Sequence, residues 1–371
     1  MSAPRSLERI GEMVRKEFRQ LFRDRRMIAF MFGAPVLQLI LLGYAVSTDV
    51  RDTPMIVVDH DRTPASRTLV DAFTASGRFV VVERSMRATD IDRALEHGRA
   101  IVGIEIPVAF EKKLERGEGS VQLLFDGTNS NYATVAKSYA ERIILNYGVQ
   151  RSGIDFRPPI DLRQRAWFNE SLESQNYNVP GVTGIIVYFV CLILTAMAVV
   201  REREIGTLEQ LMVSPLRPAE LIAGKSIPAA IIGMVDVGVV TLVAIFYFDV
   251  PFRGSVIHLF AASLVYLISG LGLGLLISTI SKTQQEAFMA TVLVFMPSLL
   301  LSGFMFPVRS MPKFFQIVTL VNPVRHYMKI VRAIFLKGVG PSAVWPEHLA
   351  LLLISTVVFA FAVSRFQKRL R

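Results

Sequence analysis

Hydrophobic residues gather in six runs that are almost free of charged residues. The runs are 17 to 28 residues long, and a single acid, Asp236, lies inside one of them. About 20 apolar residues are enough for a helix to span a bilayer, whereas helices of soluble proteins normally keep a polar stripe. We therefore predict six transmembrane helices, at 27–48, 174–200, 226–248, 254–281, 287–308 and 348–364, so that 174–364 holds the second to the sixth.

The end of the first run has the small residues of a signal-peptide cleavage site, Ala45-Val46-Ser47. However, 26 residues precede the run, and it is longer than the roughly 7–15 apolar residues of a signal peptide. We therefore interpret 27–48 as an uncleaved transmembrane helix.

Basic residues flank the six runs unevenly. Seventeen Lys and Arg lie in segments that fall on one side of the membrane, namely 1–26, 201–225, 282–286 and the tail 365–371. Short basic loops stay in the cytoplasm, whereas long segments cross largely regardless of charge. We expect both termini in the cytoplasm and 49–173 outside. Six basic residues in 309–337 oppose this orientation without reversing it.

The segment before the first run predicts a helix at the membrane interface. Apolar residues recur there every three or four positions, and basic residues fall largely between them. Such a helix lies along the lipid headgroups. We predict an elbow helix within 1–26 that either anchors the chain only or also contacts a cytoplasmic partner. Its apolar positions are Leu7, Ile10, Val14, Phe18, Leu21 and Phe22.

The segment 49–173 has the composition of a soluble domain, with 17 basic and 19 acidic residues. Short β-rich runs alternate there with helical ones, which favours an α/β domain with a partly parallel sheet. The triplet Asp59-His60-Asp61 resembles a metal cluster, but its place between a strand and Thr63-Pro64 favours turn chemistry. Strands are expected at 55–58, 79–83, 100–106 and 121–125, and helices at 63–75, 88–97, 108–116 and 132–147.

The loop 201–225 predicts a short cytoplasmic helix held between two transmembrane helices. Thr207 and Gln210 have the spacing of a capping box that starts a helix, and Ser214-Pro215 would end it. Pro218 and Glu220 suit the first turn of the next helix.

The tripeptide Gly224-Lys225-Ser226 resembles the end of a phosphate-binding loop. A phosphate-binding loop needs a glycine at the position of Ala219, and the loop follows a β-strand, whereas here the preceding residues read as a helix. We therefore predict that this chain does not itself bind a nucleotide.

Polar residues inside the predicted spans mark a candidate transport path. Asp236 lies near the middle of its span, where a carboxylate is costly and faces the bundle interior. It is either a proton relay or path lining, or an acid that supports helix packing. Pro297 predicts a kink in the fifth span, and Ser298 and Ser302 follow it.

The external segment 306–346 is apolar and amphipathic. Asn322-Pro323 predicts a helix start, with Asn as the cap and Pro in the first turn. One face of this helix is apolar, and Arg325, Lys329 and Arg332 form another. We expect it to enter the outer leaflet or to pack on the bundle.

Composition supports a membrane protein and removes one alternative. The chain is 52% hydrophobic and only 19% charged, outside the range of ordinary soluble proteins. A net charge of +10 would otherwise suggest a nucleic-acid partner, but the basic residues outside 49–173 flank membrane spans, so we expect none. The single cysteine, Cys191, excludes an intramolecular disulfide.

These features together resemble the permease subunits of bacterial type-2 ABC exporters, in the subgroup with a large external domain between the first two spans. The resemblance covers essentially the whole chain. It rests on the elbow-like 5–26, the string Arg201-Glu202-Arg203-Glu204-Ile205-Gly206-Thr207-Leu208-Glu209-Gln210-Leu211, the turn Ser214-Pro215-Leu216, Gly224-Lys225, and Val321-Asn322-Pro323.

The resemblance implies that 202–216 forms a coupling helix, which docks on a separate ATP-binding subunit. ATP and magnesium would then be handled by that partner, and this chain would bind no cofactor or metal and would not be an enzyme. The residues implied in coupling are Glu202, Glu204, Gly206, Thr207, Glu209, Pro215 and Leu216.

The resemblance also implies a location and further partners. It implies a multi-pass protein of the bacterial inner membrane that pairs with a second permease copy or a paralogue. The periplasmic domain would engage an adaptor protein or gate the substrate. The substrate would be an amphipathic drug, lipid or polysaccharide.

Two other functions remain open on the sequence. A proton-coupled secondary transporter would use Asp236 as its proton site, although no repeat relates the two halves of the chain. A membrane-anchored sensor would bind a ligand through 49–173, although the cytoplasmic tail of seven residues is short for an output region.

Overall fold

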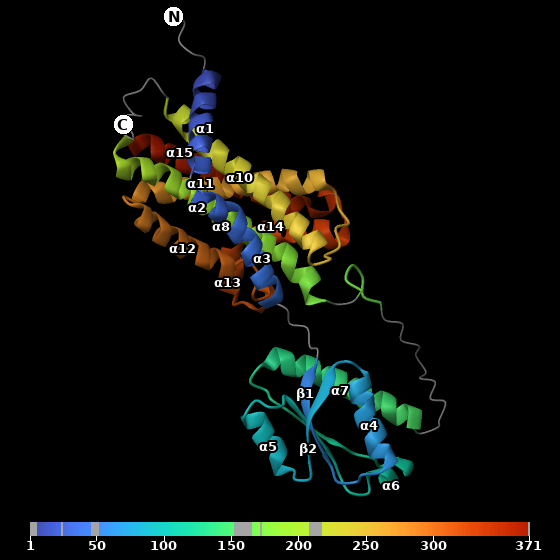
Figure 1. The fold of residues 1–371 in the computed structure, drawn as a ribbon. Coiled ribbons are helices and arrows are strands. Elements are labelled where there is room, and N and C mark those ends of the chain that lie inside the picture. The colour runs from blue at the N-terminus through green and yellow to red at the C-terminus, as the bar shows by residue number, and fades with distance from the viewer. Residues whose placement is uncertain are drawn as a thin grey trace, which may run out of the picture. The chain divides into compact units, whose positions relative to one another are not determined.

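The computed structural model describes residues 6–23, 25–45, 52–151, 165–170, 173–207 and 217–369. The chain forms two compact units, drawn in Figure 1. Unit 1 combines Met1–Ser47 with Ala166–Arg371, and unit 2 is Thr48–Arg165.

Unit 1 is helical, and four of its described helical segments are long and apolar enough to cross a membrane. They are α8 (Ser174–Ile205), α10 (Pro218–Phe246), α11 (Val256–Ile280) and the segment Pro341–Phe366, which combines a 3-10 turn with most of α15 (Trp345–Arg369). The first and fifth predicted spans correspond to shorter helices of 17 residues, Ala29–Ala45, which ends with α3 (Ala34–Ala45), and α12 (Gln284–Leu300).

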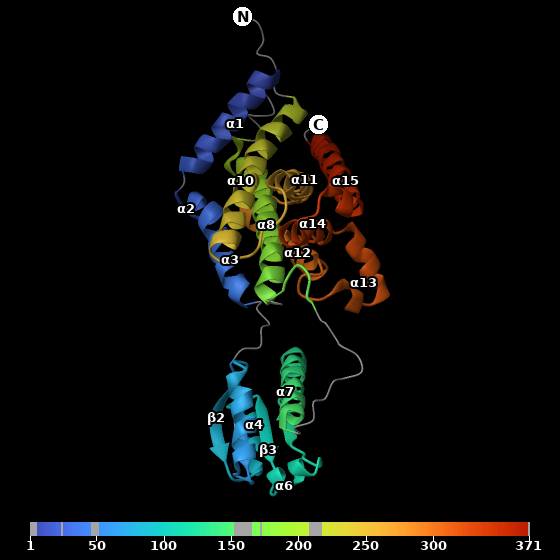
Figure 2. The ribbon, with the colours of Figure 1, turned by 90° about the vertical axis from the view of Figure 1, so that its right-hand side faces the viewer.

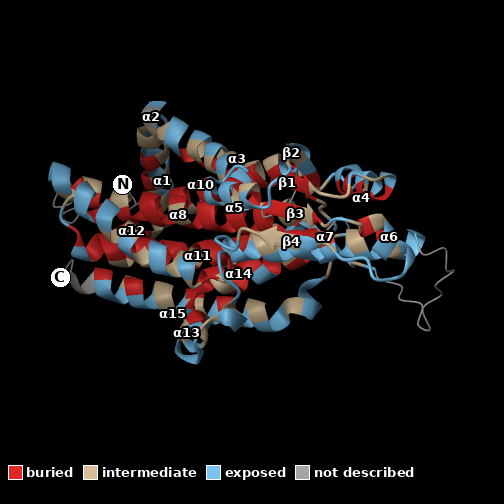
Figure 3. Cartoon of the chain, turned by 90° about the horizontal axis from the view of Figure 1, so that it is seen from below, coloured by how far each residue is buried: buried red, intermediate tan, exposed pale blue. Residues whose placement is uncertain are grey.

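The centre of unit 1 is α8, against which α3, α10, α11, α12 and α14 (Pro323–Arg332) pack (Figure 2). Figure 3 shows α8 largely buried, while α12 and α15 keep exposed sides. Three buried tyrosines stack through this core, with ring centroids 5.1 Å apart for Tyr188 and Tyr266 and 3.9 Å apart for Tyr266 and Tyr327. Gly184 makes room for the stack, because a Cβ there would lie 2.9 Å from the ring of Tyr327.

The predicted amphipathic helix at the start of the chain is present as α1 (Ser6–Arg23), followed by α2 (Arg25–Ile28). It packs on α10, where the buried side chain of Met13 fills the space over Gly224. A Cβ at Gly224 would lie 2.5 Å from Cγ of Met13. The glycine of the supposed phosphate motif therefore permits close packing of two helices.

The segment after α12 folds back onto the bundle. It contains a 3-10 turn (Val308–Ser310), α13 (Lys313–Val318), a second 3-10 turn (Thr319–Val321), α14 and a π-helical turn (Ala333–Lys337). The predicted cap of α14 is confirmed, since the side chain of Asn322 accepts a hydrogen bond from the Val324 amide at 3.1 Å. The predicted apolar face, from Val324 to Phe335, is buried.

Unit 2 contains a four-stranded sheet with the order β2-β1-β3-β4. Its strands β1 (Thr53–Asp59), β2 (Phe79–Ser85) and β3 (Val102–Ile106) are parallel, and β4 (Gln122–Phe125) is antiparallel to β3. Alternate residues of β1 face two apolar clusters, Met55 and Val57 in one and Ile56 and Val58 in the other. The helices are α4 (Pro64–Ala75), α5 (Thr89–Glu96), α6 (Phe110–Glu115) and α7 (Ser130–Arg151), so each strand and helix expected between 55 and 147 is present.

The Asp59-His60-Asp61 triplet forms the turn that was predicted. The carboxylate of Asp59 accepts hydrogen bonds from the amides of Asp61 and Arg62, at 3.0 and 2.9 Å. The Asp61 carboxylate accepts from the Thr63 hydroxyl at 2.6 Å and from the Glu111 amide at 3.0 Å. Burial raises the pKa of Asp61, but these donors outweigh it, and the pKa is lowered from its usual value.

Candidate coupling site at the end of α8

The last turn of α8 ends in a glycine cap. Gly206 has φ of +81°, the left-handed conformation that glycine adopts without strain, and its amide donates to the Arg203 carbonyl at 3.2 Å. The Thr207 hydroxyl turns back to the carboxylate and carbonyl of Glu202. The chain therefore leaves α8 at a defined point, and the next described residue is Arg217, before α10.

A buried lysine joins three helices just inside this end. Lys225 of α10 is 2% exposed, and its Nζ lies 2.8 Å from Glu17 of α1 and 3.5 Å from Glu202 of α8. The same Nζ donates to the Ala198 carbonyl at 2.9 Å. Lys16, on the rim, donates to Glu202 at 2.9 Å. We call these four side chains, Lys16, Glu17, Glu202 and Lys225, the Lys225 cluster; their formal charges cancel.

The neighbouring residues of α8 bind two further helices. The Arg203 guanidinium donates to the carbonyls of Ser278 and Ser281, at 3.1 and 2.5 Å, and so caps the end of α11. The Gln284 side chain, in the first turn of α12, donates to Glu204 at 2.7 Å. The final turn of α8 therefore contacts α1, α10, α11 and α12 through charged side chains.

A second contact ties α1 to the start of α10. Glu220 accepts a hydrogen bond from the Arg217 amide at 2.9 Å, which confirms its predicted role at the positive end of α10. It also accepts from the Ser6 hydroxyl at 2.6 Å, and Arg9 lies 3.3 Å away. The elbow helix is therefore fixed to the helices on both sides of 208–216.

Comparison with known proteins identifies the family. The model of the ABC-2 family transporter protein matches residues 25–365. The chain is 32% identical to the probable multidrug ABC transporter permease YbhR of Escherichia coli K12, over 97% of this chain and 99% of that protein. The chain belongs to the ABC-2 transporter family. It is a permease and not itself an enzyme, and relatives of it are named as ABC transporter permeases.

Other relatives extend the comparison. The probable multidrug ABC transporter permease YbhS of Escherichia coli K12 is 33% identical over 95% of each chain. The ABC transporter G family member 20 of Dictyostelium discoideum is 23% identical over 94% of the permease, which spans 49% of that longer protein. ABC-2 permeases work with an ATP-binding subunit.

The structure places the predicted coupling residues in different surroundings. Glu202 belongs to the Lys225 cluster and is buried, being 4% exposed. Glu204 and Gly206 lie at the exposed end of α8, and Thr207 contacts Glu202 there. The remaining residues, Glu209, Pro215 and Leu216, lie outside the described part of the chain, as does Gln210 of the expected capping box.

Sequence reasoning missed Glu17 and Lys225 as partners. Lys225 was considered as part of a phosphate motif and of the family resemblance, but not as a partner of Glu17 or Glu202. The available signal was that Glu17 stands four residues after Met13, on the face of α1 that turns toward α10.

A cavity of about 230 Å³ opens beside the Lys225 cluster. Its polar part includes Glu17, Gln20, Arg201 and Lys225, and its apolar part includes Leu194, Met197 and Ile232 among others. A cavity with both kinds of lining suits an amphipathic molecule.

The candidate path residues fall into two places. Asp236 is fully buried on α10, and neither carboxylate oxygen has a hydrogen-bond partner among the described residues. Pro297 lies inside α12, which ends three residues later. The Ser298 carbonyl accepts from the Asn322 side chain at 2.7 Å, and Ser302 is buried beside α14. Ser298 therefore belongs to the contact between α12 and the cap of α14, whereas Ser302 follows α12 and donates to the Leu299 carbonyl at 2.6 Å.

Proposed function

We propose that this chain is the membrane-spanning subunit of an ATP-driven exporter of amphipathic molecules, with ATP hydrolysed by a separate subunit. The observation that carries the proposal is the Lys225 cluster. It joins α1, α8 and α10 at the two helix ends that flank 208–216. A movement of 208–216 would therefore reach three helices of unit 1 together.

Burial explains why this connection can transmit movement. Lys225, Glu17 and Glu202 are removed from water, so an unpaired charge among them would be costly. Their ion pairs therefore stay formed when one of the helices moves. Glu202 acts as a positioning residue inside the joint, whereas Glu204 and Glu209 would face the ATP-binding subunit. The segment 202–216 then serves as the coupling element.

The proposed topology has six spans, with the two 17-residue helices as the first and fifth. A short helix still spans a bilayer that thins locally around it. Both termini and 202–216 lie in the cytoplasm of a bacterial cell, and residues 49–173 form an α/β domain in the periplasm. Two permeases, identical or paralogous, assemble with ATP-binding subunits, and the periplasmic domain engages an adaptor protein.

The proposed substrates are amphipathic drugs, with lipids or polysaccharides as alternatives. The relatives YbhR and YbhS are named as probable multidrug permeases. The cavity beside the Lys225 cluster combines apolar side chains with charged ones, and Arg201 of α8 is part of its lining.

Affinity purification of the permease in mild detergent tests the proposal. We expect an ATP-binding chain to co-purify, and the charge reversals Glu204→Lys and Glu209→Lys to weaken that association while permease expression stays normal. Glu286→Lys, a charge reversal at the start of the neighbouring α12, is the control and should retain the partner. Unchanged co-purification and transport in Glu204→Lys/Glu209→Lys would overturn the coupling role of 202–216.

A proton-coupled transporter is the second candidate, because Asp236 is buried without a hydrogen-bond partner in the described chain. A carboxyl group in that position is stable when it carries a proton. The variant Asp236→Asn separates the two functions. ATP-driven export should survive it, whereas a proton-coupled mechanism would lose transport even with the ATP-binding subunit bound.

A further inference from the structure

A second cavity, beside α14, is lined by basic side chains. Its volume is about 740 Å³, and Arg309, Lys313, Arg325, Lys329 and Arg332 line it. No acidic residue is among the described residues of its wall. We call it the basic cavity.

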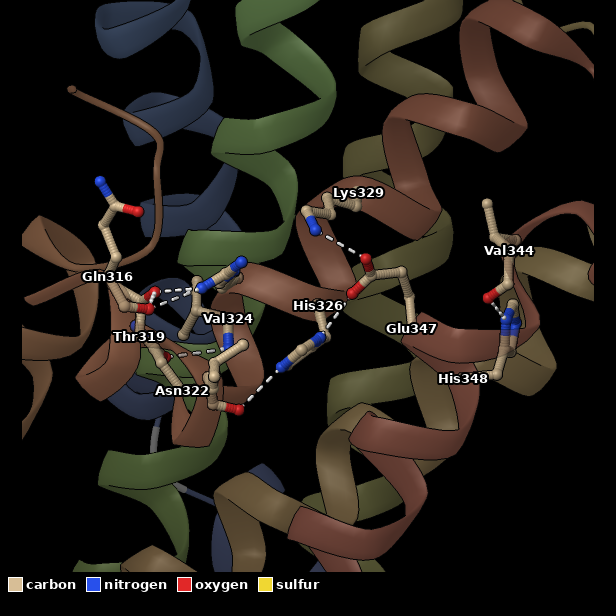
Figure 4. A network of polar contacts seen from close by, with 11 residues as sticks. Gln316, Thr319, Asn322, Val324, His326, Lys329, Val344, Glu347 and His348 are labelled. Atoms are coloured by element: carbon tan, nitrogen blue, oxygen red, sulfur yellow. Dashed lines mark hydrogen bonds and ion pairs between the residues drawn. The ribbon is translucent and has the colours of Figure 1, made fainter. Parts of the chain in front are cut away.

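One of the five cations, Lys329, pairs with an acid that is not part of the cavity wall. Lys329 lies 2.6 Å from Glu347 of α15, which also contacts His326 at 2.5 Å (Figure 4). The other four cations form no ion pair with any described residue. The basic cavity therefore keeps an excess of positive charge.

Two arginines are held in place and still have free donors. Arg325 donates through Nη1 to Thr319 and to the Gln316 carbonyl, 3.2 Å away. Arg332 donates to the carbonyl and hydroxyl of Tyr177, and its guanidinium lies 3.7 Å from that ring's centroid. Nε of Arg325 and Nη2 of Arg332 are buried and have no hydrogen-bond partner in the described chain. A buried donor without a partner is costly, so a side-chain movement that brought these donors to an acceptor in the cavity would be favourable.

The rim of the basic cavity is apolar. Ile317 and Leu320 line it, and they are 66% and 51% exposed. The adjacent Phe314, Phe315 and Val321 are exposed as well. A hydrocarbon chain that packs on these side chains would remove their apolar surface from water, which is favourable. A ligand that fits both parts has a negative head and an apolar tail.

We propose that the basic cavity binds the phosphate headgroup of an anionic amphiphile, with a phospholipid of the bilayer as its source. Guanidinium groups match the geometry of phosphate oxygens, and a phospholipid supplies both that head and an apolar tail. The site also accounts for a feature of the sequence. Five of the six basic residues in 309–337, which oppose the orientation set by the other basic segments, line this cavity.

Native mass spectrometry of the detergent-purified permease, titrated with phosphatidylglycerol, measures this binding. The permease should hold one phosphatidylglycerol at least about 10-fold more tightly than phosphatidylcholine of the same chain length. The variant R309Q/K313Q/R325Q should lower the affinity for phosphatidylglycerol by about 10-fold or more. K337Q changes the sixth basic residue, which does not line the cavity, and should leave the affinity unchanged.

The variant R309Q/K313Q alters only exposed side chains, so it should keep the melting temperature of the unmodified permease and still weaken binding. Competition with inorganic phosphate distinguishes a phospholipid headgroup from free phosphate as the ligand. Complete displacement of phosphatidylglycerol by an equal concentration of phosphate would make free phosphate the ligand and overturn the lipid assignment. Equal binding of both phospholipids, or no loss in R309Q/K313Q/R325Q, would overturn the site itself.

Discussion

Unit 1 contains two groups of charged residues that differ in charge balance. In the Lys225 cluster, two acids and two lysines lie within 2.8 to 3.5 Å of one another in pairs. In the basic cavity, four of five cations have no acidic partner among the described residues. A balanced buried set is satisfied within the protein and can act as a joint between helices. An unbalanced set attracts a counter-charge from outside, which is the property of a binding site.

The largest expected effect is in the balanced set. Lys225→Gln leaves Glu17 and Glu202 buried without their shared cation, so unit 1 should lose about 3–5 kcal/mol of stability. Thermal unfolding of the purified permease, followed by Trp fluorescence, measures the loss. Lys16→Gln is the matched control: that side chain is 47% exposed, and its removal should cost at most about 1 kcal/mol. Equal losses in the two variants would contradict the buried joint.

A smaller effect on stability is expected at the uncharged contact between α1 and α10. Gly224→Ala places a Cβ 2.5 Å from Cγ of Met13, so the two helices must separate, at about 1–3 kcal/mol. The double variant Gly224→Ala/Met13→Ala should recover part of this loss. Trypsin cleavage at the basic residues of α1 reports the separation. Wild-type cleavage rates in Gly224→Ala would show that α1 does not pack on α10.

In the unbalanced set, removal of charge should not destabilise the protein. Arg309→Gln/Lys313→Gln reduces repulsion among like charges, so stability should stay the same or rise by up to about 0.5 kcal/mol. The same thermal unfolding experiment, at low ionic strength, measures this change. A loss comparable with that of Lys225→Gln would mean that the cations of the basic cavity are also paired inside the protein.

The smallest effect on stability is expected in unit 2, where the Asp61 carboxylate accepts hydrogen bonds in a turn. The pKa of Asp61 is lowered in the folded chain, so its contribution to stability is present above the pKa of the unfolded chain and is lost as pH falls through the folded value. Pulse proteolysis of unit 2 between pH 3 and 6 should therefore show a decline in stability toward acid. In Asp61→Asn that decline should be shallower. Identical pH profiles would remove Asp61 as a source of the acid sensitivity.

Local features of the fold were predictable from the sequence because neighbouring residues determine them. The strand β1, the Asn322 cap of α14 and the turn at Asp59 all follow from short-range patterns. The extent of the membrane helices was less predictable. Hydrophobic runs give apolar length, but α12 ends at Leu300, three residues after Pro297, although the apolar run continues to Val308.

The candidate site was predictable only in part, because its contacts join distant residues. Glu17 and Lys225 are 208 positions apart, and no local pattern indicates that they pair. The sequence around Glu202 resembles a family motif, and this resemblance correctly directed attention to the C-terminal end of α8. It did not reveal that Glu202 faces inward while Glu204 stays exposed, since burial depends on where α1 and α10 pack.

The ratio of substrate transported to ATP hydrolysed tests the central claim most directly. It is measured with the permease and its ATP-binding subunit reconstituted together in vesicles, for the unmodified chain, Lys16→Gln and Lys225→Gln. If the Lys225 cluster transmits movement of 208–216 to α1, α8 and α10, Lys225→Gln should keep the partner and its ATP hydrolysis but lose at least about 10-fold in this ratio. Lys16→Gln should stay close to the unmodified chain. An unchanged ratio in a folded, partner-bound Lys225→Gln complex would contradict the claim.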